Sequence, residues 1–255
     1  MKYLLSAILL FTITVAFMPK NTTQEVDIES IIEQMEDNFR GATNIAEIKM
    51  TINRPKWSRE MVMKSWAVED RLALIMVKSP ARDKGSGFLK KDKEIWNWVP
   101  SIEKVVKLPP SMMMQSWMGS DFTNDDLVQS SSIKNDYTFA LLGYEEIDGR
   151  NCYKIEMTPK PDAPVVWGKI ITWISTENYL QLKSEFYDED DYLINIMIGD
   201  NIKEMDGRII PTRTTVTPVE EEGQNTVIEY ISIDFDAEID EAMFSVQNMK
   251  RMRID

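Results

Sequence analysis

The sequence predicts a mainly β protein built on one large, curved antiparallel sheet of about eleven strands, with a few helices. Short apolar runs at period two fill the chain from residue 45 onwards, and the one strongly helical spacing lies before them. The connections between the runs are too short for parallel crossovers. A sheet of this size tends to curl into a barrel or half-barrel, because closure or cover removes exposed edges. Its concave side must then be filled by side chains or by a ligand.

The composition excludes several kinds of chemistry. The chain has 255 residues with a formal net charge of −13, no histidine and a single cysteine. It therefore cannot form a Ser-His-Asp or Cys-His catalytic set, an imidazole metal site, a thiolate zinc cage or an intramolecular disulfide. The acidic excess repels nucleic acids and anionic membrane surfaces, and the sequence shows no local basic stripe. We expect no nucleic-acid partner, no metal and no cofactor.

The amino terminus has the pattern of a secretory signal. An apolar run from Leu4 to Met18 follows Lys2, and a polar segment begins at Pro19. The run is shorter than the roughly 20 residues that a membrane-spanning helix needs. Thr14 and Ala16 fit the positions before a cut at Phe17, although an uncleaved anchor remains an alternative. We expect a signal peptide at 1–16, a single soluble domain at 17–255 and export without a lipid anchor.

The helix is predicted to begin after Asp27, which can cap its first turn, and to end at Arg40-Gly41, with glycine in the stop position. Its apolar face, at helical spacing, consists of Ile28, Ile31, Ile32, Met35 and Phe39. Its acidic face, which we expect to lie in water, carries Glu29, Glu33, Glu36 and Asp37.

The strands that follow are recognised by alternating apolar residues and by their turns. Asp148-Gly149 and Asp206-Gly207 each join two such runs and have the composition of tight hairpin turns. The acidic runs 188–191 and 220–222 are interpreted as solvated hairpin tips. Clear period-two runs include Met50 with Ile52, Met61 with Met63, Tyr153-Ile155-Met157, Leu180-Leu182 with Phe186, Tyr192-Ile194-Ile196-Ile198, and Val227 with Ile231, Ile233 and Phe235.

The segment from Met112 to Met118 is too apolar to lie in water. It holds four methionines and a tryptophan within seven residues, in a loop or short helix. Methionine is unbranched and polarizable, so such a cluster suits contact with apolar ligands of variable shape. The competing interpretation is that these residues fill one end of the barrel core, and for any single residue this is the more common outcome.

A series of short motifs runs through the middle of the chain: Ser79-Pro80, Lys84-Gly85-Ser86-Gly87-Phe88-Leu89, Trp96-Asn97-Trp98-Val99-Pro100, Lys104-Val105, Trp117-Met118-Gly119-Ser120-Asp121-Phe122-Thr123 and Asp125-Asp126-Leu127. With these motifs the chain resembles a known family, the outer-membrane lipoprotein-sorting proteins, in their longer LolA-like branch related to the periplasmic lipoprotein carrier. The similarity runs from the first helix to the closing Glu241-Ala242-Met243-Phe244.

The resemblance implies an incomplete, open antiparallel β-barrel with a helical lid over a hydrophobic cavity that receives acyl chains. It also implies residence in the periplasm and a carrier, not an enzyme, that shields the acyl chains of lipoproteins or lipids. Such a carrier would take its cargo from an inner-membrane exporter to an outer-membrane acceptor. We expect a monomer, although free sheet edges would permit pairing with a second copy. For the cavity or its lid we predict Trp96, Trp98, Met113, Trp117 and Phe122, with Trp66 and Trp173 as further candidates on strands that could face inward.

Two other functions remain open at this point. One is a lipid-binding sensory or accessory module of the same fold, which would work with an inner-membrane exporter. The other is a lipid hydrolase that uses serine with lysine, or paired carboxylates. Asp121, Asp125 and Asp126 could bind calcium or act as an acid/base pair, but aspartates beside Thr123 and Asn124 more often form turns and helix caps.

Overall fold

The computed structural model describes residues 26–92, 94–124, 126, 133–161, 163 and 165–254. The predicted signal peptide at 1–16, its cut before Phe17, Asp125 and Leu127 lie outside this part of the chain. Within the described ranges, no helix combines the length and the apolar character that crossing a membrane requires.

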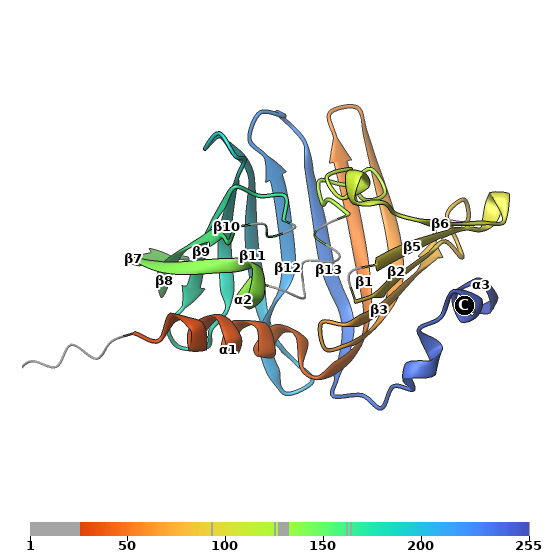
Figure 1. Ribbon diagram of the computed structural model, residues 1–255, viewed down its shortest axis with the longest axis horizontal. Coiled ribbons are helices and arrows are strands. Elements are labelled where there is room, and N and C mark those ends of the chain that lie inside the picture. The colour runs from red at the N-terminus through yellow and green to blue at the C-terminus, as the bar shows by residue number, and fades with distance from the viewer. Residues whose placement is uncertain are drawn as a thin grey trace, which may run out of the picture.

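The protein is built on one antiparallel sheet of thirteen strands, which confirms the predicted mainly β architecture (Figure 1). The count exceeds the expected eleven or so, since a strand as short as β6 shows too little alternation to be counted reliably from sequence. The strands are β1 (Thr43–Arg54), β2 (Trp57–Val68), β3 (Leu72–Ser79), β4 (Gly87–Lys91), β5 (Glu94–Val99), β6 (Lys104–Lys107), β7 (Tyr137–Ile147), β8 (Arg150–Pro159), β9 (Lys169–Ser175), β10 (Gln181–Tyr187), β11 (Leu193–Met205), β12 (Arg208–Pro218) and β13 (Asn225–Phe235).

The sheet is strongly curved but stays open. Its order is β6-β5-β4-β3-β2-β1-β13-β12-β11-β10-β9-β8-β7, so the edges are β6 and β7, and β1 pairs with β13 in the middle. The chain that links the two edges must therefore cross from one side of the sheet to the other. This crossing segment, residues 108–136, includes the short helices η2 (Pro110–Met112) and α2 (Ile133–Asp136).

Helix α1 (Ile28–Arg40) has the limits that the sequence predicts. The Asp27 carboxylate accepts a hydrogen bond from the backbone N–H of Ser30 at 3.0 Å. Gly41 ends the helix with a φ of +63°, a conformation that glycine adopts without steric cost. Ile31, Ile32 and Met35 are buried, so the helix packs one apolar face against the protein.

The two predicted hairpins are confirmed. Asp148-Gly149 joins β7 to β8 and Asp206-Gly207 joins β11 to β12, with all four residues at positive φ. The acidic run at 188–191 forms the turn between β10 and β11, where the Asp188 carboxylate accepts backbone N–H groups of Asp190 and Tyr192.

Both faces of the sheet are partly covered. On the concave face, apolar residues of β1, β2 and β13 form one core with Trp117, and those of β8 and β9 form another with α1. On the convex face, β2 to β5 pack against the C-terminal segment, which contains η4 (Glu241–Met243) and α3 (Val246–Arg251). A further 3-10 helix, η1 (Pro100–Ile102), lies between β5 and β6.

Candidate functional site

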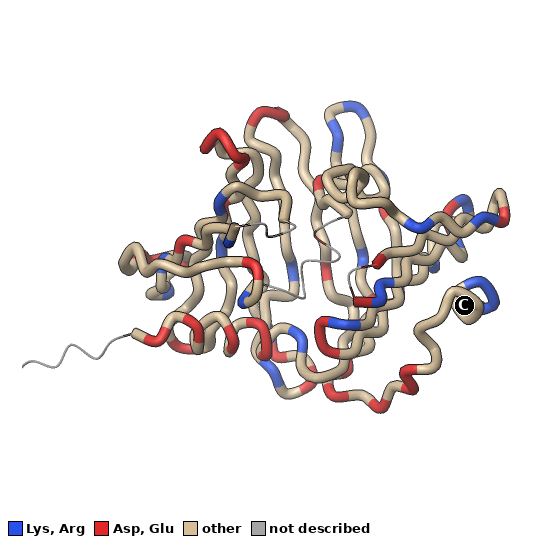
Figure 2. The backbone as a smooth tube through the Cα atoms, viewed as in Figure 1, with Lys and Arg blue, Asp and Glu red and all other residues tan. Residues whose placement is uncertain are grey.

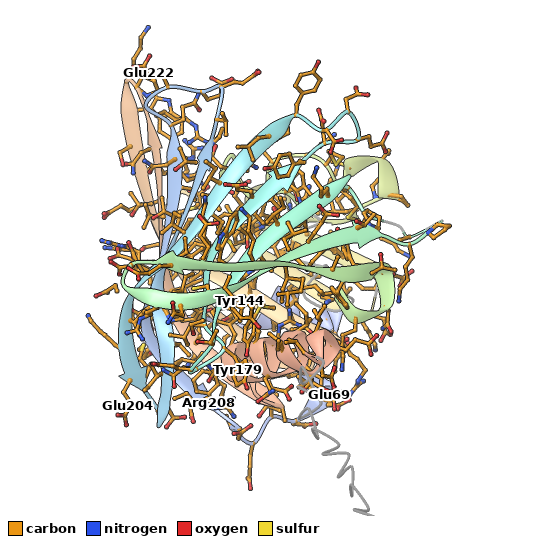
Figure 3. All side chains as sticks on the ribbon, turned by 90° about the vertical axis from the view of Figure 1, so that its left-hand side faces the viewer. Glu69, Tyr144, Tyr179, Glu204, Arg208 and Glu222 are labelled. Atoms are coloured by element: carbon orange, nitrogen blue, oxygen red, sulfur yellow. The ribbon has the colours of Figure 1, made fainter. Side chains whose placement is uncertain are left out.

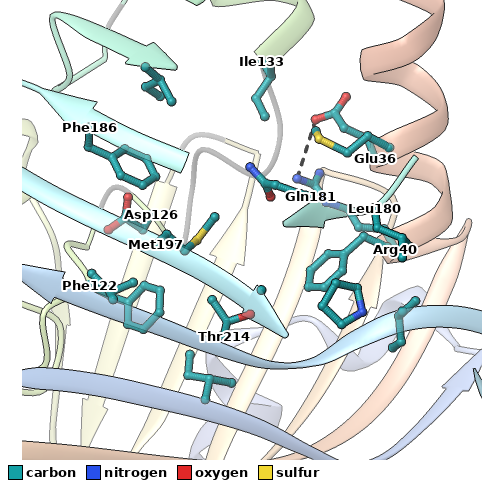
Figure 4. A pocket seen from close by; sticks show the side chains of 18 of the residues that line it. Glu36, Arg40, Phe122, Asp126, Ile133, Leu180, Gln181, Phe186, Met197 and Thr214 are labelled. Atoms are coloured by element: carbon teal, nitrogen blue, oxygen red, sulfur yellow. Dashed lines mark ion pairs between the residues drawn. The ribbon is translucent and has the colours of Figure 1, made fainter. Parts of the chain in front are cut away.

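A cavity of about 320 Å³ lies between the concave face and helix α1 (Figure 4). It is within the size range of small-molecule sites, and most of its wall is apolar. The apolar part of the wall comes from α1, the crossing segment and strands β8 to β13. It consists of Met35, Phe39, Phe122, Ile133, Met157, Trp167, Ile170, Leu180, Phe186, Met197, Ile210, Pro211, Val216 and Ile228.

Helix α1 also contributes charge to this wall. Glu36 and Arg40 line the cavity and form an ion pair of 3.7 Å, with side chains 18% and 21% exposed (Figure 4). Burial raises the pKa of the Glu36 carboxyl above its ordinary value and lowers that of the Arg40 guanidinium, each partly offset by the other's charge. The expectation that Glu36 lies in water with the other acidic residues of the helix is wrong, because the end of α1 turns this side chain towards the sheet.

On the side of the cavity that α1 forms, polar contacts hold the helix against the sheet. The Asn38 amide donates to the backbone oxygens of Asn178 at 3.1 Å and Ile209 at 3.3 Å, which holds Tyr179 close to the helix (Figure 3). Phe39 meets Tyr230 edge to face at 5.9 Å. Burial raises the pKa of the Tyr230 phenol to about 12, so this group is neutral at physiological pH.

The crossing segment closes the opposite side. Asp121 lines the cavity, and its carboxylate binds the Arg54 guanidinium at 3.0 Å through both oxygens and accepts the Thr226 hydroxyl at 2.7 Å. Arg54 also donates to the Gly119 carbonyl at 2.9 Å. Phe122 lies beside this anchor and lines the cavity. The segment is therefore held on β1 and β13 by charged hydrogen bonds.

Asp126 takes part in a local cap. Its carboxylate accepts the Thr123 backbone N–H at 2.7 Å, and the Thr123 hydroxyl accepts the Asp126 N–H at 3.1 Å. Burial raises the pKa of this carboxyl, and the bonds from Thr123 oppose the rise. Among the described side chains, no group of three Asp, Glu, His or Cys residues is arranged to hold a metal ion.

Two of the predicted site residues lie together on the concave face. Phe122 lines the cavity, whereas Trp117 is 2% exposed and packs edge to face on Phe88 with ring centres 5.4 Å apart. Trp117 thus fills the core beside the cavity, in the way the competing interpretation described. Met113 is half-buried in the crossing segment and does not line the cavity. Met114, one residue further on, is 58% exposed.

Four predicted tryptophans lie on the convex face, away from the cavity. Trp66, Trp96 and Trp98 pack in the core that the C-terminal segment covers. Trp173 lies in a small convex cluster, between the ammonium groups of Lys154 and Lys183, and donates its indole N–H to Glu145 at 3.1 Å. Side chains alternate between the two faces of a strand, and on β2 the residues that point away from Trp66, such as Met61 and Met63, lie in the concave core.

Sequence reasoning missed most of the wall. The helix pattern pointed to Met35 and Phe39. The period-two run predicted around β11, Tyr192-Ile194-Ile196-Ile198, does not include Met197, which alternates with it and lines the cavity. Trp167 was missed because it lies in an irregular stretch before β9, yet it is 5% exposed, and its side chain, like Thr123, opposes the rise in the pKa of the Asp126 carboxyl. It packs on Phe186 at 5.2 Å and forms one end of the cavity.

Comparison with known proteins places this fold. A family model described as an uncharacterized-protein-like family matches residues 69–251. A search of curated proteins gave no match. Among solved structures, a DUF1329 family protein from Desulfovibrio piger has a TM-score of 0.79 at 23% identity, over 86% of this chain and 96% of its own.

Two further solved structures carry the lipoprotein-sorting description. A domain from Vibrio parahaemolyticus, described as an outer-membrane lipoprotein-sorting protein domain, has a TM-score of 0.77 at 23% identity, over 87% of this chain and 97% of its own. A LolA superfamily protein from Nitrosomonas europaea has a TM-score of 0.75 at 21% identity, over 87% and 99%. At these identities the likeness is one of fold. The chain therefore belongs to the family whose model spans residues 69–251, and its fold is that of the LolA-like lipoprotein-sorting proteins.

Proposed function

We propose that the protein is a periplasmic carrier that holds the acyl chains of lipoproteins or lipids in its cavity during transfer towards the outer membrane. The observation that carries this proposal is a largely apolar cavity of about 320 Å³ between the concave face and α1. Each buried methylene contributes about 0.8 kcal/mol, so such a cavity can retain an acyl chain without a covalent bond. The fold shared with a lipoprotein-sorting domain supports the same cargo class.

The position of the charges favours an amphiphilic cargo. Glu36 and Arg40 stand on α1, and Asn38 and Tyr179 lie beside them at the same side of the cavity. Trp167, Ile170 and Phe186 present apolar surface to the cavity, and the Asp126 carboxyl that also lines it is bound to Thr123. A bound molecule would place its hydrocarbon against the apolar wall and keep its polar group near α1, because burying a polar group without partners costs free energy.

We further propose that this carrier is not an enzyme. Two carboxyl groups of the cavity wall are engaged in ion pairs, Glu36 with Arg40 and Asp121 with Arg54. Asp126 caps Thr123. These groups stabilise the wall and do not form a nucleophile with a general base. Hydrolysis of short-chain and long-chain nitrophenyl esters tests whether the protein is an enzyme. Hydrolysis faster than in buffer alone would contradict this proposal.

The binding test uses a variant that fills the cavity. Met197 is half-buried and lines the cavity on β11, so Met197→Trp places extra volume in the empty space. The matched control is Ile196→Trp on the opposite face of the same strand. We expect a fluorescent fatty-acid probe and co-purified acylated cargo, detected by native mass spectrometry, to bind to wild type and control and to be lost from Met197→Trp. Equal binding by all three proteins would show that the probe and the cargo do not bind in this cavity.

The second candidate is a lipid-binding sensory or accessory module. It shares the cavity with the carrier, so ligand binding alone does not separate the two. Transfer does: a carrier releases its acyl probe to acceptor vesicles or to a lipoprotein acceptor within the assay, whereas a sensor retains it. Retention would favour the sensory module.

A further inference from the structure

Basic side chains gather at one end of this acidic molecule. In sequence they are separated, because residues 82–107 hold seven basic and four acidic residues and a second group lies at 250–253. Helix α3 packs on β4 and β5 and brings the two groups together. Figure 2 shows several Lys and Arg segments around this end of the molecule. We call the exposed side chains Lys91, Lys107, Lys250, Arg251 and Arg253 the basic edge.

The strand register places several of these residues on one face. Lys91 pairs with Glu94, and Lys107 pairs with Trp96, so these side chains all stand on the convex side of β4, β5 and β6. The Lys107 ammonium lies 5.5 Å from the centre of the Trp96 ring, and the Lys250 ammonium lies 5.3 Å from that of Trp98. Tryptophan rings and lysines thus form one continuous surface, opposite to the cavity.

Most of this charge is not neutralised within the protein. Lys107 forms an ion pair with Glu94. Lys91, Lys250 and Arg253 form no ion pair with any other described residue. Asp92 and Glu103, exposed in the turns beside these strands, offset part of the charge. More distant acidic side chains act weakly here, since the Debye length at physiological ionic strength is about 8 Å. The edge therefore presents local positive charge although the whole chain carries −13.

Apolar groups lie among these cations. Trp96 and Val105 are half-buried on the same face, and Ile102, at the tip of the β5–β6 hairpin, is 58% exposed. Lysine stems and tryptophan rings are suited to the boundary between headgroups and acyl chains, because each has an apolar body and a polar end. A water-facing edge would not require this mixture.

We propose that the basic edge docks the protein onto the anionic headgroups of a phospholipid bilayer, with Trp96 and Val105 at the interface. This goes beyond the carrier function and does not depend on what the cavity holds. Docking on the convex side leaves α1 and the cavity free of the membrane surface. The sequence-based expectation that anionic membranes repel the chain then holds for its other surfaces and not for this one.

The test is co-sedimentation of the mature protein with vesicles of phosphatidylglycerol and phosphatidylcholine in equal parts. Phosphatidylcholine vesicles and high salt are the reference conditions. Lys91→Gln/Lys250→Gln removes two charges from the basic edge. Lys56→Gln/Lys203→Gln removes two exposed charges elsewhere and gives the same net charge. Each lysine near an anionic surface contributes about fivefold to binding, so we expect about 25-fold weaker binding for the first variant and little change for the second.

The wild-type protein should sediment with the anionic vesicles at low salt and stay in solution with phosphatidylcholine alone. Failure of the wild-type protein to bind anionic vesicles would overturn the proposal and would favour an acidic protein as the occupant. Equal loss in both double variants would also overturn it, because net charge and not the basic edge would then control binding. Fatty-acid probe binding, measured on the same samples, should be unchanged, so failure here is distinguishable from failure of the carrier function.

Discussion

The two halves of the concave face are closed in different ways. Over β1, β2 and β13 the crossing segment inserts Trp117, and Met50, Met61 and Met63 beneath it are fully buried. Over β8 to β12 the cover is helix α1, whose Ile31, Ile32 and Met35 reach the sheet while a cavity remains beside them. Both halves offer apolar strands of similar composition.

The difference lies in what covers each half. The crossing segment fits one large ring into the sheet, anchored by Arg54 and Asp121. Helix α1 ends instead in Glu36, Asn38 and Arg40, which turn towards the sheet and keep its last turns from packing closely. An apolar sheet face thus becomes core or cavity according to the side chains of the segment that covers it.

Removing the inserted ring should have the largest effect. Trp117→Ala deletes a side chain that is 2% exposed, and substitutions of this kind cost about 3–5 kcal/mol. Chemical denaturation measures the loss. The control, Met114→Ala in the same segment, alters a side chain that is 58% exposed and should change stability by less than about 0.5 kcal/mol. Similar losses for both variants would show that Trp117 does not close this half.

A buried lysine should make the stability of the protein depend on pH. Lys90 on β4 is 4% exposed and donates to the Asp70 carbonyl at 2.6 Å, and burial together with the Arg40 charge lowers its pKa from 10.5 to about 8. Between these pH values the unfolded chain binds the proton and the folded protein does not. Stability from this group therefore rises as pH increases from about 8 to 10.5, by about 3 kcal/mol in total.

Lys90→Met isolates this effect. The difference in unfolding free energy between wild type and variant, measured by urea titration at several pH values, should shift in favour of the wild type above pH 8. A difference that stays flat up to pH 10.5 would contradict a lowered pKa at Lys90.

Removing the Arg54–Asp121 anchor of the crossing segment should have a smaller effect on stability. Arg54 and Asp121 are 14% and 7% exposed, so Arg54→Ala leaves a buried carboxylate without its cation and should cost about 2 kcal/mol. The control is Arg213→Ala, which breaks an exposed pair with Asp200 and should cost less than about 1 kcal/mol. A loss no greater than that of the control would mean that the segment is held by Trp117 and Phe122 alone.

Local elements were predictable because their signals are local. Asp27 and Gly41 set both ends of α1, and Asp148-Gly149 set a hairpin, since capping and positive φ depend on a few adjacent residues. The open antiparallel sheet followed from period-two runs joined by short connections. The family resemblance agreed with the fold that the structure shows.

The site was less predictable because alternation does not say which face is concave. Trp96 and Trp98 were predicted for the cavity or its lid, but the face of β5 on which both lie meets α3 and not the cavity. Period two could not decide this, because the C-terminal segment covers the convex side and both faces are apolar. The charges of Glu36 and Arg40 were assigned to water for a similar reason, since helical spacing does not reveal where the sheet curves around the helix end.

The pairing of β1 with β13 constrains how the chain can fold. Asn44 meets Phe235 in this pair, so the centre of the sheet depends on contacts between residues near the two ends of the described chain. Until β13 (residues 225–235) has been synthesised and has paired, one edge of β1 is unpaired. Strands β1 to β6 and strands β7 to β12 are then joined only by the crossing segment. Closing so long a loop is entropically costly and slow. Strand β1 would be the natural place for a chaperone to hold this chain during folding, because its exposed edge could otherwise pair with another molecule.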